Sequence, residues 1–579
     1  MFRQALYRAF SLLAEGKISK FKALSHKPRV AQTAKLLSII AANADSSFGR
    51  DHNFASIKSI ADFQAAVPIR EYEDFRPYVE RATAGEKKVL TTAEPLMYAT
   101  TSGTSGKPKY IPITPGYMEE FRHASVVSGY HLLKSFPKID GGVTLSIASP
   151  AEEGRTEGGT PYGAISGQLF QKEPFLIKKF ISPIPYEVYL IEDYDTRYYT
   201  LLRLALVLPL SCFYTLNPST ISLLCRRLQE YAPSLIEDIA GGIISPPDCG
   251  RSDKLSSEAR AAITPLLRAN PERAAFLREL FGSGQFVPHK IWPTLSVVSC
   301  WTKAAASFYL ADFPQYFGNV PVCDITYGAS EGRGTVFMGP GLQVLAIQSH
   351  FFEFVPEDEI QAEKPTVLLA DQLKEGANYF ILFTTSGGLY RYNINDVVKV
   401  TGFYNATPLI EFQYKGGNIS SFTGEKITEL QVTTAVNRVA REASVKLRFF
   451  TVVPVFRPEP HYEVWLETDN RVDNGTDAYA GAARPSNFAA LIDNELAREN
   501  SEYKVKRQSL RLGEIETKNL RQGSYENFRK FLTSQGVADA QIKVSHLNPK
   551  DEVRKYFEAE LLNAPAGHLS KVSQSLSGI

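Results

Sequence analysis

The chain has 579 residues, which is too many for one compact core, so we expect at least two domains. Hydrophobic residues make up 44% and charged residues 22%, as in an ordinary globular protein. The 64 basic and 62 acidic residues nearly cancel, which leaves a net charge of +2. This balance does not support general nucleic-acid binding or adsorption to a membrane surface.

Neither the cysteines nor the apolar segments indicate secretion or a membrane. The N-terminus predicts an amphipathic helix without a cleavage site, and the apolar segment from Leu201 to Leu216 contains Arg203 and is shorter than a membrane span. An odd number of cysteines without metal-ligand spacing favours free thiols in a reducing compartment. They are Cys212, Cys225, Cys249, Cys300 and Cys323. We therefore expect a soluble, cytoplasmic protein that acts as a monomer.

The order of local patterns predicts an α/β protein. Residues 1 to about 95 have mainly helical apolar spacing. From there to about residue 400, helical and strand-like segments alternate, which is typical of an α/β domain with mixed sheets. The sequence predicts a helix from Gly116 to Leu133 and a buried strand from Val143 to Ala148.

A linker is expected where Lys415 is followed by two glycines and then by a polar stretch up to Lys426. We therefore predict an N-terminal domain over residues 1–417 and a C-terminal domain over residues 418–579. In the second domain the patterns predict helices over 428–442 and 487–500, and strands over 445–455 and 461–466.

The first motif that carries chemistry is the loop TTSGTSGKPK, from Thr100 to Lys109. It lies between two short apolar runs, so we expect strand, loop and strand. Glycines let backbone N–H groups turn inward, hydroxyls donate hydrogen bonds and lysines neutralise charge, which together suit a polyphosphate. The spacing of Gly103 and Gly106 differs from that of a Walker A motif. A flexible hydrophilic hairpin is the alternative, but the order of residues favours phosphate binding.

Two later stretches carry carboxylates. In VCDITYGASEG a strand ends in a turn, where Tyr327 offers a flat face for a purine and Glu331 an oxygen ligand for Mg²⁺. An ordinary turn with a surface glutamate is the alternative. Asp396 interrupts the apolar run from Gly388 to Val400, and a buried carboxylate needs a partner. That partner is either the ribose of a nucleotide or Arg391, and the residues alone leave both open.

The motifs taken together resemble the Gretchen Hagen family of acyl acid amido synthetases, a branch of the acyl-adenylate-forming enzymes. The resemblance covers nearly the whole chain, through FGR, VPI, YED, TSGTSGKPKYIPIT, TPYGAISG, YGASEG, YRYNINDVVKVTGF, TGEK and QIKV. It implies an α/β fold with a large N-terminal adenylation domain, built from a β-barrel and α/β sheets. A small, mobile C-terminal α+β domain would rotate over it between two half-reactions.

The resemblance also implies ATP and Mg²⁺ as cofactors. Tyr327 would lie against adenine, Asp396 would bind the ribose and Glu331 would coordinate Mg²⁺. Phe412 and Lys426 match nucleotide contacts of the hinge region, and Lys543 matches the catalytic lysine that reaches the α-phosphate. The β- and γ-phosphates would be held by four hydroxyls of the loop, which are Thr101, Ser102, Thr104 and Ser105.

The chain departs from the family pattern at three places. Asn395 stands where the family usually has glycine before the ribose aspartate, although asparagine tolerates a left-handed backbone. Ser545 and His546 replace the usual proline and arginine after the lysine. Alanines 304–306 occupy the position of a glycine. These differences concern the acid or acceptor site more than ATP binding.

We therefore expect an ATP-dependent ligase that activates a carboxylic acid as acyl-AMP and transfers the acyl group to an amine, which we expect to be an amino acid. One alternative passes the acyl group to a thiol such as coenzyme A. The other is a nucleotide-binding pseudoenzyme of the same fold. The neighbourhood of His123, Val126, Tyr162 and Trp301 suggests a pocket for an aromatic or aliphatic acid.

Overall fold

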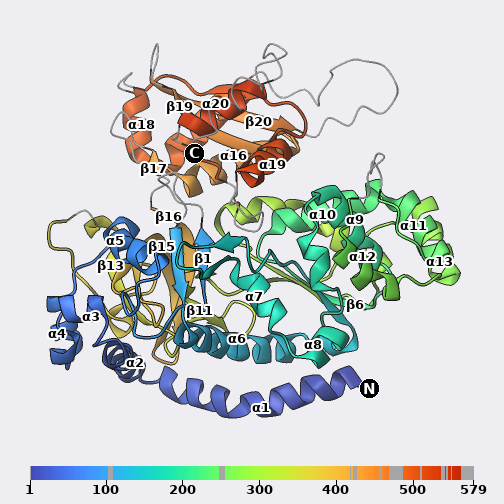
Figure 1. Cartoon of the computed structure of the whole chain (residues 1–579). Helices are drawn as coiled ribbons and strands as arrows, with labels where there is room; N and C mark the ends of the chain where they lie inside the picture. Colours follow the sequence, from blue (N-terminus) through green and yellow to red (C-terminus); the bar gives the residue numbers. More distant parts are fainter. Residues whose placement is uncertain are drawn as a thin grey trace. The chain divides into compact units, whose positions relative to one another are not determined.

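The computed structural model divides the chain into two compact units (Figure 1). The first contains Met1–Thr101, Lys109–Ile394 and Val398–Phe412; the second contains mainly Gln413–Ile579, together with Asn395–Val397. The domain boundary expected at residue 417 stays a prediction. The structure describes residues 2–101, 109–246, 254–360, 362–416, 419–420, 427–455, 460–468, 487–508, 512–535, 542, 545–548 and 551–561. None of the described helices has the length and apolar character that crossing a bilayer demands.

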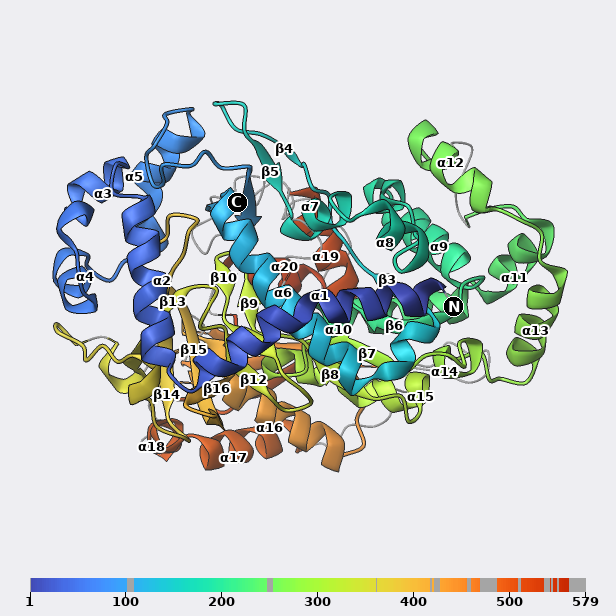
Figure 2. The ribbon, with the colours of Figure 1, turned by 90° about the horizontal axis from the view of Figure 1, so that it is seen from below.

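Helices dominate the N-terminal part of the first unit, as the apolar spacing predicted. Two of them begin at a capping serine: Ser46 accepts a hydrogen bond from the backbone N–H of Gly49, and Ser59 accepts one from that of Asp62. Figure 2 shows the first of these helices running across α6 (Pro115–Ser135), with which it is in contact. The bounds are α1 (Phe2–Ser25), α2 (Pro28–Ala42), α3 (Ser47–Asp51), α4 (Ile60–Ala66) and α5 (Tyr72–Thr83).

A parallel four-stranded sheet forms the centre of the helix-rich part of this unit, in the order β3-β6-β7-β8. Because the strands are parallel, their carboxyl ends meet at one edge of the sheet, where α/β proteins commonly bind ligands. The strands are β3 (Val143–Ser146), β6 (Leu210–Tyr214), β7 (Val297–Cys300) and β8 (Val322–Asp324). The accompanying helices are α7 (Ile165–Gln171), α8 (Phe175–Phe180), α9 (Tyr194–Ala205), α10 (Pro218–Glu230), α11 (Ala232–Gly241), α12 (Ser257–Ile263), α13 (Pro271–Gly282), α14 (Pro288–Ile291) and α15 (Phe313–Phe317).

A six-stranded sheet, in the order β11-β12-β16-β15-β14-β13, packs against the N-terminal helices and α6. Its strands are β11 (Thr335–Phe337), β12 (Gln343–Leu345), β13 (Phe351–Pro356), β14 (Asn378–Thr384), β15 (Tyr392–Tyr404) and β16 (Thr407–Lys415). Two smaller sheets carry the sequence motifs. They are β2-β1-β5-β4, with β1 (Met97–Thr101), β2 (Lys109–Ile113), β4 (Gly154–Arg155) and β5 (Pro161–Gly163), and the hairpin of β9 (Gly328–Ala329) and β10 (Gly332–Arg333).

The second unit is built around a three-stranded sheet in which β19 (Leu447–Val455) and β20 (His461–Thr468) are antiparallel and β21 (Glu516–Asn519) is parallel to β20. Buried aromatic side chains, among them Phe449, Trp465 and Phe557, form its core. The other elements are β17 (Ile419–Ser420), β18 (Ile427–Thr428), α16 (Glu429–Glu442), α17 (Phe488–Glu499), α18 (Ser501–Gln508), α19 (Ser524–Ser534) and α20 (Asp551–Ala559). The mixed α/β class predicted from the sequence is confirmed.

Candidate functional site

The strands on both sides of the hydroxyl-rich loop form as predicted. β1 and β2 are antiparallel, and Thr101 at the end of β1 faces Lys109 at the start of β2. Tyr72 anchors this end of the ladder, because its hydroxyl accepts a 2.7 Å hydrogen bond from the backbone N–H of Tyr110. Ser102, Thr104 and Ser105, and the side chain of Thr101, lie outside the described residues. Their phosphate-binding role therefore stays a prediction.

Glu331 lies in the two-residue turn that joins β9 to β10. Its exposed fraction is only 7%. Within the described part of the chain, no group donates a hydrogen bond to its carboxylate or forms an ion pair with it. Burial raises the pKa of Tyr72 to about 12, and the charge of Glu331 acts in the same direction. The carboxylate is therefore near enough for its charge to act on the tyrosine that anchors the loop strands. A buried carboxylate without a partner suits a cation, because either a cation or a donor must offset the cost of burying its charge.

Tyr327 and Phe412 come together although 85 positions separate them in sequence. Their rings are nearly parallel, with an angle of 11° and a centroid separation of 5.8 Å. Gly334 makes room for the tyrosine, since a Cβ atom at this glycine would lie 2.2 Å from Cδ1 of the Tyr327 ring. The pair offers a flat aromatic surface, and its tyrosine lies four positions before Glu331; such a surface suits a purine base.

Asp396 lies in β15 and is 4% exposed. The preceding Asn395 has a left-handed backbone with φ of 64°, so asparagine fills the conformational role that glycine has in the family pattern. Arg391, the alternative partner of Asp396, is engaged elsewhere: its Nε lies 3.0 Å from Glu353 Oε2, and its Nη1 donates to the carbonyl of Val67. Arg391 therefore pairs with Glu353, a residue of β13.

Lys426 and Lys543 lie outside the described residues, so their predicted roles are not tested. Ser545 and His546, two of the departures from the family pattern, lie in the second unit. His546 is fully buried, its Nδ1 lies 2.7 Å from the carbonyl oxygen of Phe450, and its ring stacks on the Phe450 ring. Burial lowers the pKa of His546 from 6.5 to about 4. This departure from the family pattern is therefore part of the core of the second unit.

A cavity of about 250 Å³ adjoins the hairpin, and sequence reasoning did not locate it. It lies between α6 and the carboxyl ends of β6, β7 and β8, with Ser125, Tyr214, Ser299, Asp324 and Arg333 in its lining. His123 and Val126, which the sequence placed near a pocket for the acid, lie on the same helix but do not line this cavity, and that pocket stays a prediction. The rule that parallel sheets bind ligands at their carboxyl edge could have found the strand residues.

Arg333 gives this cavity a positive charge. Its guanidinium lies over the ring of Phe121, 4.0 Å from the centroid, and Nη1 donates to Thr326 Oγ1 at 3.3 Å. Asp324 is the acidic residue of the lining, and burial raises the pKa of its carboxyl. The cavity is thus shaped by polar groups as well as by apolar ones, and it suits a small organic acid.

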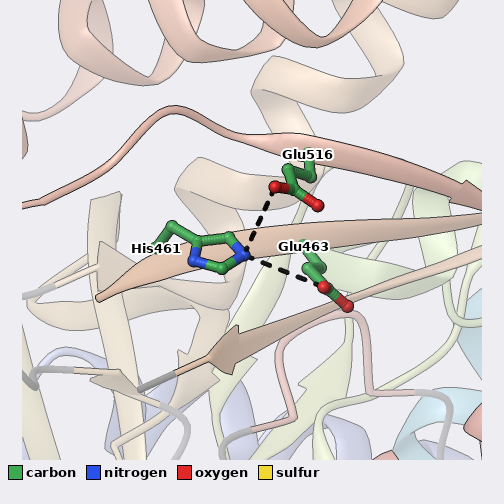
Figure 3. A group of neighbouring side chains, drawn as sticks. All are labelled: His461, Glu463 and Glu516. Atoms are coloured by element: carbon green, nitrogen blue, oxygen red, sulfur yellow. Dashed lines mark ion pairs between the residues drawn. The ribbon is translucent and has the colours of Figure 1, made fainter. Parts of the chain in front are cut away.

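A separate group of side chains, His461, Glu463 and Glu516, lies on one face of the sheet in the second unit (Figure 3). His461 Nε2 is 3.8 Å from Glu463 Oε1 and 3.9 Å from Glu516 Oε1. Such residues can bind a divalent metal. However, Glu463 already accepts hydrogen bonds from the Lys518 ammonium and, at 2.7 Å, from Trp465 Nε1. Lys518 would compete with a metal ion for the same carboxylate, so we interpret the group as an ion-pair network.

Comparison with known proteins gives consistent matches along the chain. The domain models described as GH3 family N-terminal, central and C-terminal domain match residues 17–322, 343–415 and 430–552. The first match alone spans more than half of the chain.

Two plant proteins illustrate the similarity in sequence. An indole-3-acetic acid-amido synthetase, GH3.3 from Arabidopsis thaliana, is 25% identical over 537 residues, which is 87% of either chain. A jasmonoyl–L-amino acid synthetase, JAR4 from Nicotiana attenuata, is 23% identical and covers 91% of this chain and 92% of its own. Among solved structures, the GH3.15 acyl acid amido synthetase superposes with a TM-score of 0.81 over 94% of this chain and 96% of its own, at 21% identity, which shows a shared fold.

Proposed function

This chain belongs to the GH3 family, and from that premise we propose that it is an ATP-dependent acyl acid amido synthetase. It would activate a carboxylic acid as acyl-AMP and then transfer the acyl group to the amine of an amino acid. Relatives that match along most of the chain carry the names of acid–amino acid conjugating synthetases. The observation that carries the proposal within the molecule is the β9–β10 hairpin, which combines an aromatic face with a buried carboxylate that has no partner among the described residues.

We propose that ATP is bound by residues on both sides of this hairpin. The adenine would stack on Tyr327 beside Phe412, the ribose would bind Asp396, and the loop hydroxyls at Thr101, Ser102, Thr104 and Ser105 would receive the β- and γ-phosphates. Lys426 would complete the nucleotide contacts from the hinge. Glu331 fits a magnesium ion because it is a buried oxygen donor without a partner in the described residues. Magnesium bound there would offset the negative charge of the phosphates.

The chemistry asks for positioning and positive charge more than for a base. The acid carboxylate attacks the α-phosphate in line and expels pyrophosphate, so negative charge builds up between two anions. We propose that Lys543 supplies a cation at the α-phosphate. Because water would hydrolyse the acyl-adenylate, enclosure of the site protects the intermediate.

We assign the acid to the cavity between α6 and the ends of the parallel strands. Arg333 provides a fixed positive charge there, and Ser125 and Tyr214 provide hydroxyl groups near apolar walls. The volume of about 250 Å³ favours a compact acid, with one ring or a short chain, over a long-chain acid.

We further propose that residues 1–417 act as the adenylation domain and residues 418–579 as a mobile cap. A cytoplasmic location and a monomeric state remain predictions of the sequence.

Acid-dependent exchange of labelled pyrophosphate into ATP tests the first half-reaction. With a panel of compact carboxylic acids and no amine, we expect exchange with at least one acid. ATP binding without exchange across the whole panel would instead favour a pseudoenzyme.

Mass spectrometry of products from pooled acids, amino acids and coenzyme A tests the second half-reaction. We expect amides of amino acids together with AMP. Thioesters in their place would support the coenzyme A alternative and contradict the proposed acceptor.

A further inference from the structure

The backbone of the hairpin is held on both sides of Glu331 by two buried side chains. The Tyr117 hydroxyl donates a 2.8 Å hydrogen bond to the carbonyl of Ser330, and the backbone N–H of Arg333 donates a 2.9 Å hydrogen bond to His350 Nε2. The two rings stack with their centroids 5.8 Å apart. The residue before Glu331 and the second residue after it are therefore both tied to the interior of the first unit.

The hydrogen bond from Arg333 fixes the tautomer of His350. A backbone N–H can only donate, so Nε2 must accept and the ring proton resides on Nδ1. Nδ1 lies 3.0 Å from Glu120 Oε2. His350 is completely buried, and Glu120 is 3% exposed. The carboxylate therefore lies beside the ring at this distance, although Nδ1 makes no aligned hydrogen bond to it, and the ring is held by the hydrogen bond at Nε2 and by stacking on Tyr117.

Glu120 is itself held as an anion. Burial alone raises the pKa of its carboxyl, but His350 and Lys35 together lower it below the ordinary value. Lys35 Nζ lies 2.6 Å from Oε1, and the hydroxyl of Ser386 donates to the same oxygen. A charge this deeply buried is stable only when its partners are in place, and Lys35 and Ser386 are those partners here.

The hairpin lies directly against the ring of His350. A Cβ atom at Gly332 would be 3.1 Å from His350 Cδ2 and 2.6 Å from Phe383 Cδ1. Glycine at this position therefore lets the turn approach the imidazole ring closely enough for the hydrogen bond from Arg333.

We propose that Glu120 and His350 are positioning residues, which hold the turn so that the Glu331 carboxylate presents its oxygens to magnesium. They act through the backbone of Ser330 to Arg333 and contact neither ATP nor the acid. This inference rests on the proposed function, in which Glu331 is the magnesium ligand.

Two substitutions of His350 separate positioning from packing. His350→Phe keeps a ring that can stack on Tyr117 but has no acceptor for the Arg333 N–H. His350→Gln loses the ring, but its amide oxygen reaches about as far as Nε2 and restores an acceptor. If His350→Phe does not fold, Tyr117→Phe serves instead, because it removes only the hydroxyl that donates to Ser330.

The first measurement needs no activity. Amide hydrogen exchange of the 328–335 segment is compared in the ligand-free proteins. We expect His350→Phe to accelerate exchange at Arg333 about ten-fold, as loss of one buried hydrogen bond implies, and His350→Gln to recover most of the protection. Equal protection in all three proteins would overturn the inference.

The second measurement is the magnesium midpoint of acid-dependent pyrophosphate exchange. We expect it to rise about ten-fold in His350→Phe, with glutamine restoring it, while thermal midpoints change similarly in both variants. Equal magnesium midpoints in the two variants and wild type would contradict the positioning role. If wild type performs no exchange with any acid, the proposed function fails, and hydrogen exchange still decides whether His350 holds the turn.

Discussion

Three buried glutamates in the first unit differ in what surrounds them. Glu353 pairs with Arg391 at 3.0 Å, and Glu120 pairs with Lys35 at 2.6 Å. Among the described residues, nothing pairs with Glu331, although its exposed fraction is also small. A buried carboxylate requires a counter-charge or hydrogen-bond donors, so Glu331 is the one of the three that suits a bound cation.

Replacing Glu331 with glutamine tests this role. Glu331→Gln keeps the shape of the side chain and removes its charge, so we expect the magnesium concentration for half-maximal pyrophosphate exchange to rise ten-fold or more. Glu157→Gln, at an exposed position, is the control and should titrate as wild type does. An unaltered magnesium titration of Glu331→Gln would show that this carboxylate does not hold the metal.

His546 makes the stability of the second unit depend on pH. Its folded-state pKa is lowered from 6.5 to about 4 by burial, so the unfolded chain takes up a proton first as the pH falls. The stability that the neutral ring contributes is present above about pH 6.5 and is lost as the pH falls towards 4. By linkage, the loss over this window is on the order of 3 kcal/mol.

Thermal unfolding at pH 7 and pH 5 checks this linkage. His546→Phe preserves a ring next to Phe450 but cannot titrate, so its midpoint should fall less between the two pH values than that of wild type. The exposed His26→Gln variant should follow wild type. Identical pH dependence in His546→Phe and wild type would mean that this imidazole is not the titrating group.

At the scale of elements, a tight turn, a glycine and a left-handed residue position the side chains of the candidate site. The β9–β10 hairpin brings Tyr327, Glu331 and Arg333 into one small region, and Gly334 leaves space for the tyrosine ring. In β15, Asn395 adopts the left-handed conformation that the residue before Asp396 needs. These positions determine where side chains point and contribute little core of their own.

Gly334→Ala tests whether the Tyr327 ring binds the nucleotide. The added methyl group would overlap the ring, so the ring must move, and we expect the KM for ATP to rise about ten-fold because base stacking is weakened. Gly282→Ala is the control, since a Cβ there meets nothing within 4 Å. If Gly334→Ala binds ATP as wild type does, adenine does not stack on Tyr327.

At the scale of the whole molecule, the chain divides its proposed chemistry between two units. The carboxylate and aromatic candidates Glu331, Tyr327 and Phe412 belong to the first unit, whereas Lys543 follows Ile542, a buried residue of the second. A lysine contributed by a different unit can serve one half-reaction without serving the other. This arrangement predicts that the two half-reactions respond differently to its loss.

Lys543→Ala should slow adenylation about a hundred-fold, because a cation at the developing charge is removed. Amide formation from supplied acyl-adenylate should stay near the wild-type rate, and the thermal midpoint should hardly change. Lys504→Ala, on an exposed face of the same unit, is the control. Equal slowing of both half-reactions would contradict a role confined to adenylation, and no slowing would remove Lys543 from the site.

The sequence by itself determined the local elements, the mixed α/β class and the family. Glycines, prolines and apolar spacing act over a few residues, so the strands around the loop from Thr100 to Lys109 and the helices α6 and α16 could be predicted from neighbours alone. The motifs at Tyr327, Glu331 and Asp396 were visible for the same reason. Their order along the chain identified the Gretchen Hagen family, and this prediction is confirmed.

Only the tertiary structure decided which distant residues meet. The pairing of Arg391 with Glu353, the stacking of Tyr327 on Phe412 and the cavity that contains Arg333 all join segments far apart in sequence. The contacts of Glu120 with Lys35 and with His350 do the same, since Lys35 and His350 are more than 300 positions apart. Such contacts depend on how helices and sheets pack. A buried charge, for example, is stabilised by whichever partner the packing brings next to it. Local propensities depend on neighbouring residues only, so they do not predict these contacts.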